Sequence, residues 1–482
     1  MTNAVVGSRF GMGLAWVVPV GVMGICLYAQ MAGRVAAVSG RATFEIIRER
    51  LGPRMGAANL SASFFINLMT VTAEIGGVAL ALQLATDVGP PLLWVPVAAF
   101  AVWVVIWRVK FSIMENATGL LGLCLIVFAV AVFALQPHWS TLAHQALAPV
   151  IPQSESAATY WYFAIALFGA AMTPYEVFFF SSGAREEHWT TKDLSTSRLN
   201  VLIGFPLGGI LSLAIAACAT LVLLPAQIEV TSLSEITMPV VMAGGKLALA
   251  FVIIGIVAAT FGAALETTLS SGYTLAQFFG WAWGGKFRRP AEAARFHTVM
   301  LVTVLACAAV LFTGIDPILV TEYSVVFSAI ALPLTYLPIL IVANDPEYMG
   351  RHVNGRAVNV AGSIYLVIIL IASLAAIPLM IVTGGRPMNR RTNELPEAPR
   401  TPGTLIDARL HLLDRQMLDA DGAAVGIVDD LELSDMSDGV PHVTAILTGQ
   451  VLFTRIFGGR QPASRLQALP GGSSRRLTLR CT

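Results

Sequence analysis

The sequence predicts an all-α, multi-pass membrane protein with about ten spans, followed by a small β-rich module. Of its 482 residues, 56% are hydrophobic and only 12% are charged, and the apolar residues gather into segments long enough to cross a bilayer. Near the C-terminus, alternating apolar and polar residues predict strands instead. The formal net charge is +1, so overall charge indicates neither a nucleic acid nor an acidic partner.

The apolar segments have the lengths of membrane-spanning helices. The first is too long for a signal peptide and lacks a cleavage-site pattern, so it is expected to remain as a span. The ten predicted spans are 11–34, 60–85, 91–107, 116–136, 158–182, 199–224, 246–280, 297–313, 318–343 and 357–383.

The loops between these segments alternate in charge, and Lys and Arg are retained on the cytoplasmic side during insertion. The loops 85–91, 136–158, 225–245 and 313–318 contain neither residue. Residues 1–10 are therefore expected outside, in the plasma (bacterial inner) membrane. The basic loops carry Arg34, Arg41, Arg48, Arg50, Arg54, Arg108, Lys110, Arg185, Lys192, Arg198, Lys286, Arg288, Arg289, Arg295, Arg351 and Arg356.

Residues 1–384 form the predicted membrane domain. The composition changes after residue 384, and a Pro-rich linker is predicted over 385–403. A soluble module follows over 404–460, and the Gly-, Ser- and Arg-rich residues 461–482 are expected to be disordered.

The Asp421-Gly422 dipeptide favours a tight turn, so Leu412–Leu418 and Ala424–Leu431 are predicted to pair as strands, and His442–Phe457 supplies further strand-like sequence. An even number of spans places this module outside the cytoplasm. The basic cluster at Arg386, Arg390 and Arg391 argues for the opposite side.

One stretch, Phe168–Glu176, interrupts an apolar span with a proline and a carboxylate. Pro174 has no N–H and so frees a carbonyl about one turn earlier, near Ala170, while Glu176 places an ionisable group at membrane depth. Unpaired carbonyls of this kind coordinate ions in transporters. The alternatives are a purely structural proline kink and a carboxylate that pairs with Arg185.

Three further residues are candidates for the same pathway. Thr173 either faces the site or bonds its own helix backbone, and Tyr175 either walls the site or packs as an interfacial aromatic. Glu74 lies inside an apolar stretch, where a carboxylate costs about 2.5–3.5 kcal/mol, so a functional position is expected. Glu266 and Glu322 are expected at helix ends or facing loops.

Nothing in the sequence favours an enzyme. It contains no phosphate-binding glycine loop, catalytic triad or zinc motif, and its histidines and five cysteines lack metal-ligand or disulfide spacing. No cofactor is expected apart from a transported ion.

Several stretches resemble the Nramp divalent-metal transporter family, and their order and spacing agree over about residues 5–384. The C-terminal module resembles a PRC-barrel through Leu418–Asp430, which implies a small β-barrel-like fold and an unknown partner. The stretches similar to Nramp are Gly7–Trp16, Ala73–Leu82, Ser324–Pro333 and Asn344–Gly350.

The resemblance implies the inverted-repeat transporter fold, in which two interrupted helices cradle the ion. Ala170–Glu176 matches the second interruption. The first is expected just before Met1, which indicates a fragment or a mis-assigned start and a missing first helix. The implied metal ligands are the Ala170 backbone carbonyl, Thr173 and Glu176, and the implied pathway residues are Pro174, Tyr175 and Glu74.

Departures from the family pattern predict a change of ion. The metal-selective branch has Met-Pro-His where this chain has Thr173-Pro174-Tyr175, and a thioether favours Mn²⁺ and Fe²⁺, whereas oxygen ligands suit Mg²⁺. The pattern is similar to the Nramp-related magnesium transporter branch, although Met172 lies only one residue away. Val71 and Tyr175 replace residues of the family's proton route, so passive or weakly coupled transport is expected.

Three functions stay open at this point. The first is divalent-cation transport through the bilayer, with Mg²⁺ favoured and Mn²⁺ or Fe²⁺ as possible further ions. The second is a carrier of amino acids or other organic solutes with the same fold. The third is a non-transporting membrane scaffold or sensor, in which the C-terminal module binds a partner.

Overall fold

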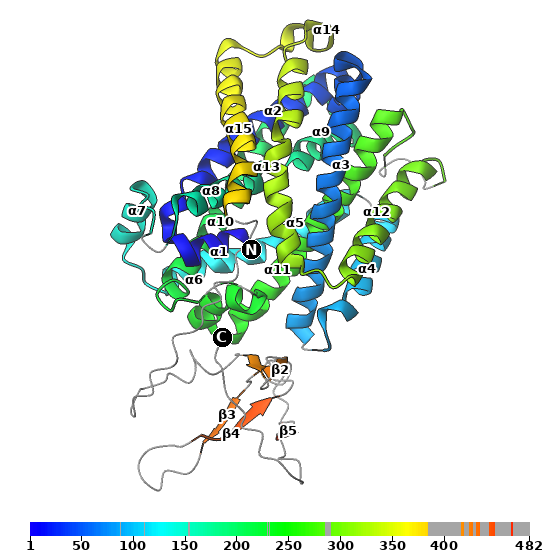
Figure 1. The fold of residues 1–482 in the computed structure, drawn as a ribbon. Helices are drawn as coiled ribbons and strands as arrows, with labels where there is room; N and C mark the ends of the chain where they lie inside the picture. The colour runs from blue at the N-terminus through cyan, green and yellow to red at the C-terminus, as the bar shows by residue number, and fades with distance from the viewer. Residues whose placement is uncertain are drawn as a thin grey trace. The chain divides into compact units, whose positions relative to one another are not determined.

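A computed structural model of the 482-residue chain is nearly all helical through residue 383 (Figure 1). It describes residues 1–383, apart from 87, 110, 153–154, 229, 231 and 285–290, together with five short strands between 416 and 465. The chain divides into two units, Met1–Leu82 with Pro90–Asn389 and Gln83–Gly89 with Arg390–Thr482.

The helices of the first part of the chain fall into three groups along the sequence. The first is α1 (Thr2–Phe10), η1 (Gly11–Leu14), α2 (Val17–Ser39), α3 (Thr43–Thr86), η2 (Pro91–Leu93), α4 (Val95–Arg108), α5 (Phe111–Gly122), η3 (Leu123–Leu125) and α6 (Ile126–Ala134). The second is α7 (Trp139–Leu147), α8 (Ala157–Ala171), α9 (Pro174–Glu186), η4 (Thr191–Asp193) and α10 (Leu194–Val222). The third is α11 (Leu233–Phe279), α12 (Ala294–Phe312), α13 (Pro317–Val342), α14 (Pro346–Met349), η5 (Gly350–His352) and α15 (Arg356–Val382).

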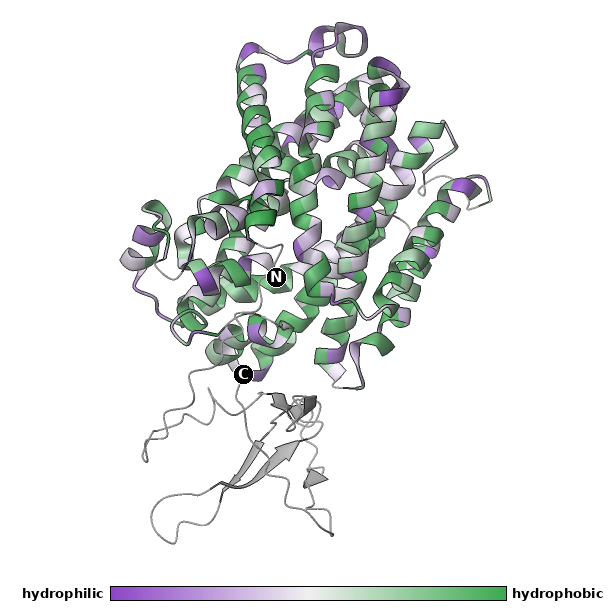
Figure 2. Ribbon diagram, in the orientation of Figure 1, coloured by the Kyte–Doolittle hydropathy of each residue, from purple (hydrophilic) through white to green (hydrophobic). Residues whose placement is uncertain are grey.

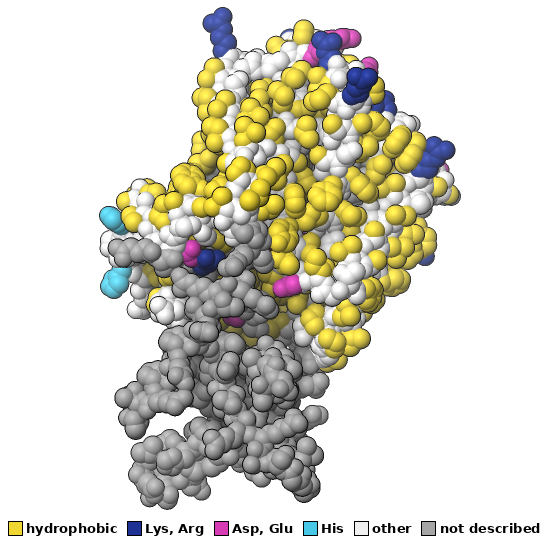
Figure 3. Space-filling view, in the orientation of Figure 1, with side chains coloured by type: hydrophobic (Ala, Val, Ile, Leu, Met, Phe, Trp, Pro, Cys, Tyr) yellow, Lys and Arg dark blue, Asp and Glu magenta, His cyan; other side chains and the backbone are white. Residues whose placement is uncertain are grey.

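The prediction of ten spans is confirmed. Ten of the described helical stretches are long and apolar enough to cross a membrane, and each predicted segment falls on one of them. Apolar residues cover most of the helices in Figure 2, and hydrophilic residues gather near helix ends. Most of the Lys and Arg side chains visible in Figure 3 lie at the end of the helical unit that carries α14, as expected for loops on one side of a bilayer.

Two long helices contain a bend that the sequence explains. Gly52 of α3 has φ 84° and Gly245 of α11 has φ 63°, a backbone conformation that L side chains rarely adopt. Pro53 follows Gly52 and cannot donate a helical hydrogen bond. The spans predicted to begin at 60 and 246 therefore begin after these bends.

Close helix contacts hold α8 in place. A Cβ added at Gly169 of α8 would lie 2.4 Å from the Val325 carbonyl oxygen of α13, and one added at Gly21 of α2 would lie 2.5 Å from the Ala171 side chain. Small residues at such positions allow helices in a membrane to pack closely. The C-terminal end of α8 is therefore held between α2 and α13.

The second unit contains β1 (Gln416–Leu418), β2 (Ala424–Ile427), β3 (Asp430–Leu433), β4 (Val443–Thr448) and β5 (Ser464–Arg465). β1 pairs with β2 antiparallel, which confirms the predicted pairing around Asp421-Gly422 for Gln416–Leu418 and Ala424–Ile427, whereas Asp430 and Leu431, predicted in the second strand, belong to β3. β3, β4 and β5 form a second antiparallel sheet in that order. The predicted linker and the rest of the module lie outside the described residues. In the tail 461–482, which is predicted to be disordered, Ser464–Arg465 form β5 instead, and its other residues also lie outside the described part. Its barrel fold and its side of the membrane stay predictions.

Candidate metal-ion site

The helix break predicted at Phe168–Glu176 is present. α8 ends at Ala171, Met172 and Thr173 connect the helices, and α9 begins at Pro174. A residue before proline is pushed towards extended backbone, and Thr173 has φ −63° and ψ 131°. Proline suits the first position of a helix, where its missing N–H costs nothing. Pro174 thus breaks the span and starts its second half.

The break exposes backbone oxygens to the interior of the bundle. Because Pro174 has no N–H, the Ala170 carbonyl has no donor four residues later. The neighbouring Met172 carbonyl accepts a hydrogen bond from the Tyr336 hydroxyl of α13, at 3.2 Å. The partial negative charge at the end of α8 favours a cation here.

Two oxygen-bearing side chains lie on the other side of the break. Glu176 is half-buried in the first turn of α9, where the helix dipole stabilises a carboxylate. The Thr173 hydroxyl is buried beside the Glu176 carboxyl and makes no hydrogen bond of good geometry. Together with the Ala170 carbonyl these groups form a small set of oxygen donors.

Within the described segment Phe168–Glu176 the only sulfur is that of Met172, and it makes a packing contact. Met172 is fully buried, and a Cβ added at Gly24 of α2 would lie 2.7 Å from its Sδ atom. The same position is 2.9 Å from the ring of Tyr365 in α15. The Met172 thioether therefore fills space against α2.

Tyr175 lies inside the bundle. It is 7% exposed, and its carbonyl accepts a hydrogen bond from Ser270 Oγ of α11, at 3.4 Å. Its phenol is within electrostatic range of the carboxyls of Glu74, Glu176 and Glu266. Glu74 of α3 and Glu176 of α9 both lie within range of Tyr175, and their place in an ion pathway stays a prediction.

The expectation for Glu266 is wrong. Glu266 lies well inside α11, which continues to Phe279, one helical turn before Ser270 and on the same face towards Tyr175. Sequence reasoning missed it because an apolar helix gives no sign of which face meets a neighbour. The spacing to Ser270 and Thr274, also polar, was the available signal. Glu322, by contrast, lies in the second turn of α13, near a helix end as expected.

The carboxyls of Glu74, Glu176 and Glu266 all act on the Tyr175 phenol. Among the described residues, no three His, Cys, Asp or Glu side chains are arranged to hold a metal ion directly. Val71, one turn before Glu74, is fully buried and cannot carry a proton.

Side-chain contacts between helices lie on either side of the break, along the α8–α9 axis. Towards the loops without Lys or Arg, Arg9 binds Glu155 at 2.7 Å, and the Tyr160 hydroxyl donates to the Gly13 carbonyl at 2.9 Å while accepting from Trp16 at 3.0 Å. We refer to these contacts as the outer closure.

Towards the arginine-rich end, Gln277 of α11 donates to Ser182 Oγ of α9 at 2.9 Å, and the Tyr273 hydroxyl donates to the buried Glu186 at 3.3 Å. The Thr43 N–H at the start of α3 donates to Ser181 Oγ at 2.9 Å. These contacts form the inner closure.

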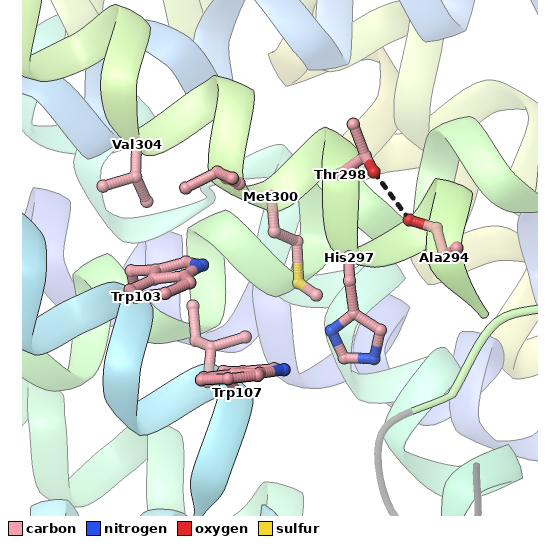
Figure 4. Close-up of a pocket in the computed structure, with 9 residues that line it drawn as sticks. Trp103, Trp107, Ala294, His297, Thr298, Met300 and Val304 are labelled. Atoms are coloured by element: carbon pink, nitrogen blue, oxygen red, sulfur yellow. Dashed lines mark hydrogen bonds between the residues drawn. The ribbon is translucent and has the colours of Figure 1, made fainter. Parts of the chain in front are cut away.

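A pocket of about 290 Å³ lies away from the break, between α4 and α12. Trp103, Trp107, His297 and Met300 line it, and the Thr298 hydroxyl bonds the Ala294 carbonyl of its own helix at 2.8 Å (Figure 4). Its lining contains no carboxylate, the ligand that hard divalent cations such as Mg²⁺ prefer.

The sequence model described as "Natural resistance-associated macrophage protein-like", abbreviated Nramp, matches residues 1–378. The chain belongs to the Nramp family. Two relatives are named divalent metal cation transporter MntH. The protein from Pectobacterium carotovorum is 25% identical over 379 residues, or 77% of this chain and 88% of the relative, and that from Deinococcus radiodurans is 24% identical over 383 residues, or 77% and 83%.

The Nramp fold is also seen in a solved structure. The manganese transporter of Eremococcus coleocola, crystallised with an aromatic bis-isothiourea substituted compound, matches with a TM-score of 0.63 and 19% identity. The match covers 80% of this chain and 84% of the other. The predicted transporter fold is therefore confirmed for the helical unit.

Proposed function

We propose that this protein transports divalent metal cations across the plasma (bacterial inner) membrane, and that it favours Mg²⁺ and other hard cations over Mn²⁺ and Fe²⁺. Membership of the Nramp family and the names of its relatives support the transport of divalent metals. The preference for hard ions departs from the manganese transporter with the same fold. It rests on the donors at the break.

One observation carries the proposed preference. The groups at the α8–α9 break that can reach an ion are oxygens, namely the Ala170 carbonyl, the Thr173 hydroxyl and the Glu176 carboxylate, while the Met172 sulfur packs against α2. Hard cations such as Mg²⁺ take oxygen ligands, and soft thioethers select transition metals. Mg²⁺ gives up its waters reluctantly and is usually held through one or two carboxylates, so a donor set with a single carboxylate, that of Glu176, suits it.

Pro174, Tyr175 and Glu74 belong to the proposed pathway by position. Pro174 creates the break, Tyr175 forms an inner wall, and Glu74 contributes negative charge. We add Glu266 to this group because it lies on the face of α11 towards Tyr175. With Val71 and Tyr175 in place of residues of the family's proton route, transport driven by the membrane potential is expected, at about 2.3 kcal/mol per charge per 100 mV.

The first test is uptake of Mg²⁺ and Mn²⁺ into liposomes that contain the purified protein, comparing wild type with Glu176→Gln. Loss of the charge at the break is expected to slow Mg²⁺ uptake by about tenfold, since charged oxygen ligands are the strongest ligands of hard cations. Glu292→Gln, at an exposed carboxylate, is the control. An unchanged rate in Glu176→Gln removes this residue from the pathway, and amino-acid uptake without metal uptake would favour the carrier alternative.

A second test addresses selectivity. Thr173→Met places a soft donor where the metal-selective branch has one, so Mn²⁺ uptake is expected to rise relative to Mg²⁺ by about tenfold. Thr173→Val, which removes the hydroxyl and adds no donor, is the matched control. A Mn²⁺ to Mg²⁺ ratio that stays the same in Thr173→Met would contradict the role of Thr173 in the preference.

A further inference from the structure

A buried polar stripe runs along one face of α3. Asn59, Ser63, Asn67 and Thr70 follow one another at helical spacing and end one turn before Glu74. The first four are buried, with exposures from 0 to 8%. Buried polar side chains in a membrane protein need partners, because lipid and apolar side chains offer none.

The stripe faces α13, which lies beside α3 in Figure 1. Asn59 Nδ2 donates to the Leu334 carbonyl at 2.7 Å, and Thr70 Oγ1 lies 2.8 Å from Ser324 Oγ. These two contacts show that α3 and α13 run antiparallel. The register places Asn67 beside the turn of α13 that carries Ser328.

The middle of this seam is left without partners. Both polar atoms of the Asn67 amide are buried and make no hydrogen bond to any described residue, although Asn67 is fully buried. Ser328 Oγ, on a side chain only 1% exposed, is in the same state. At either end the polar groups are bonded, including Ser63 Oγ to Asn59 Oδ1 at 3.0 Å.

The chemistry of the unpaired atoms selects the ligand. A cation would satisfy Asn67 Oδ1 but would be repelled by the amide Nδ2 group, and an anion would satisfy only Nδ2. A water molecule both donates and accepts, so it can bond both atoms of the amide and the Ser328 hydroxyl. Leaving these groups dry would cost free energy for each of them.

We propose that the seam between α3 and α13 is a hydrated compartment, in which ordered water binds Asn67 and Ser328. The Asn59–Leu334 contact closes it towards the arginine-rich end, and the Thr70–Ser324 contact separates it from Glu74 by one helical turn. Opening of the second contact would bring this water to the Glu74 carboxyl. The compartment does not depend on which ion the protein carries.

The first test uses cysteine reactivity in a chain whose five native cysteines are replaced by alanine. Asn67→Cys and Ser328→Cys are compared with Ile66→Cys and Ala329→Cys, which are adjacent and equally buried. Because the reactive thiolate forms only where it is solvated, the first pair is expected to react with methyl methanethiosulfonate at least about tenfold faster. Equal rates in the two pairs overturn the proposal.

A second measurement does not depend on reagent access. Asn67→Leu replaces the amide by an apolar group of similar shape. In a dry seam this change removes unpaired polar groups and raises the melting temperature of the purified protein, which would overturn the proposal. In a hydrated seam it leaves the bound water and the Ser328 hydroxyl without a hydrogen-bond partner, so the melting temperature is expected to fall by several degrees.

Discussion

The two closures that flank the α8–α9 break are built from different chemistry. The outer closure combines one ion pair, Arg9–Glu155, whose side chains are 21% and 12% exposed, with two hydrogen bonds of the Tyr160 hydroxyl. The inner closure combines several hydrogen bonds, of which that between Ser182 and Gln277 is neutral and buried. An ion pair responds to charge and salt, whereas buried neutral bonds do not.

The difference predicts how each layer opens. In the outer layer a competing cation at Glu155 can release the ion pair, which leaves the two hydrogen bonds of the Tyr160 hydroxyl. The inner layer needs several bonds to break together, on α3, α9 and α11. We therefore expect the outer closure to respond more strongly to charge and salt than the inner one, and the substitutions below test this contrast from the largest expected effect to the smallest.

Breaking the ion pair is expected to have the largest effect. Arg9→Met keeps an apolar chain near Phe10 and Phe163 but leaves Glu155 unpaired at low exposure, so the free energy of unfolding should fall by about 2 kcal/mol. Thermal unfolding of the purified protein measures it. Arg9→Lys, which retains the charge, should recover part of the loss.

The matched control is Arg41→Met, the same substitution at an exposed pair. Arg41 binds Glu49 at 2.6 Å with side chains 38% and 49% exposed, and this hydrogen bond raises the pKa of the Arg41 guanidinium, so the pair is charged at neutral pH. Exposed pairs contribute little, so no change in melting temperature is expected. Equal losses of unfolding free energy in Arg9→Met and Arg41→Met would contradict the larger contribution expected of the Arg9–Glu155 pair.

At the inner closure, Ser181→Ala is expected to lower the free energy of unfolding by about 1–2 kcal/mol. The substitution leaves the buried Thr43 N–H without its acceptor, and an unpaired buried donor carries a desolvation cost of that size. Ser234→Ala, at an exposed serine, serves as the control in the same unfolding assay. A loss in Ser181→Ala larger than in Arg9→Met would reverse the proposed order.

The smallest expected effect is that of ionic strength on the stability lost in each variant. Between about 0.1 M and 1 M ionic strength the screening length falls from about 10 Å to about 3 Å, so the difference in stability between wild type and Arg9→Met should shrink. The difference between wild type and Ser181→Ala should stay constant because no charge is involved. Parallel unfolding curves at both ionic strengths measure the contrast, and a salt effect of the same size on both variants contradicts it.

The helix break shows how much of the candidate site can be predicted from the sequence. Pro174 determines locally where α8 must end and α9 must begin, so the positions of the Ala170 carbonyl and Glu176 along the chain followed from the residues themselves. Glu266 did not follow, because its role depends on α11 packing against α9. The buried, unpaired amide of Asn67 likewise did not follow from the sequence, because it depends on α13 packing beside α3.

The sequence by itself determined the ten spans, the break and the arginine-rich loops, since long apolar runs, a proline and charged residues act through local chemistry and the membrane. The tertiary structure decided how each helix is rotated about its axis. That rotation turned the Met172 sulfur towards Gly24, set Tyr175 among three carboxyls and built the two closures. A helix that is apolar nearly all round does not encode this choice in its own periodicity, because only the neighbouring helices determine which face is the interior one.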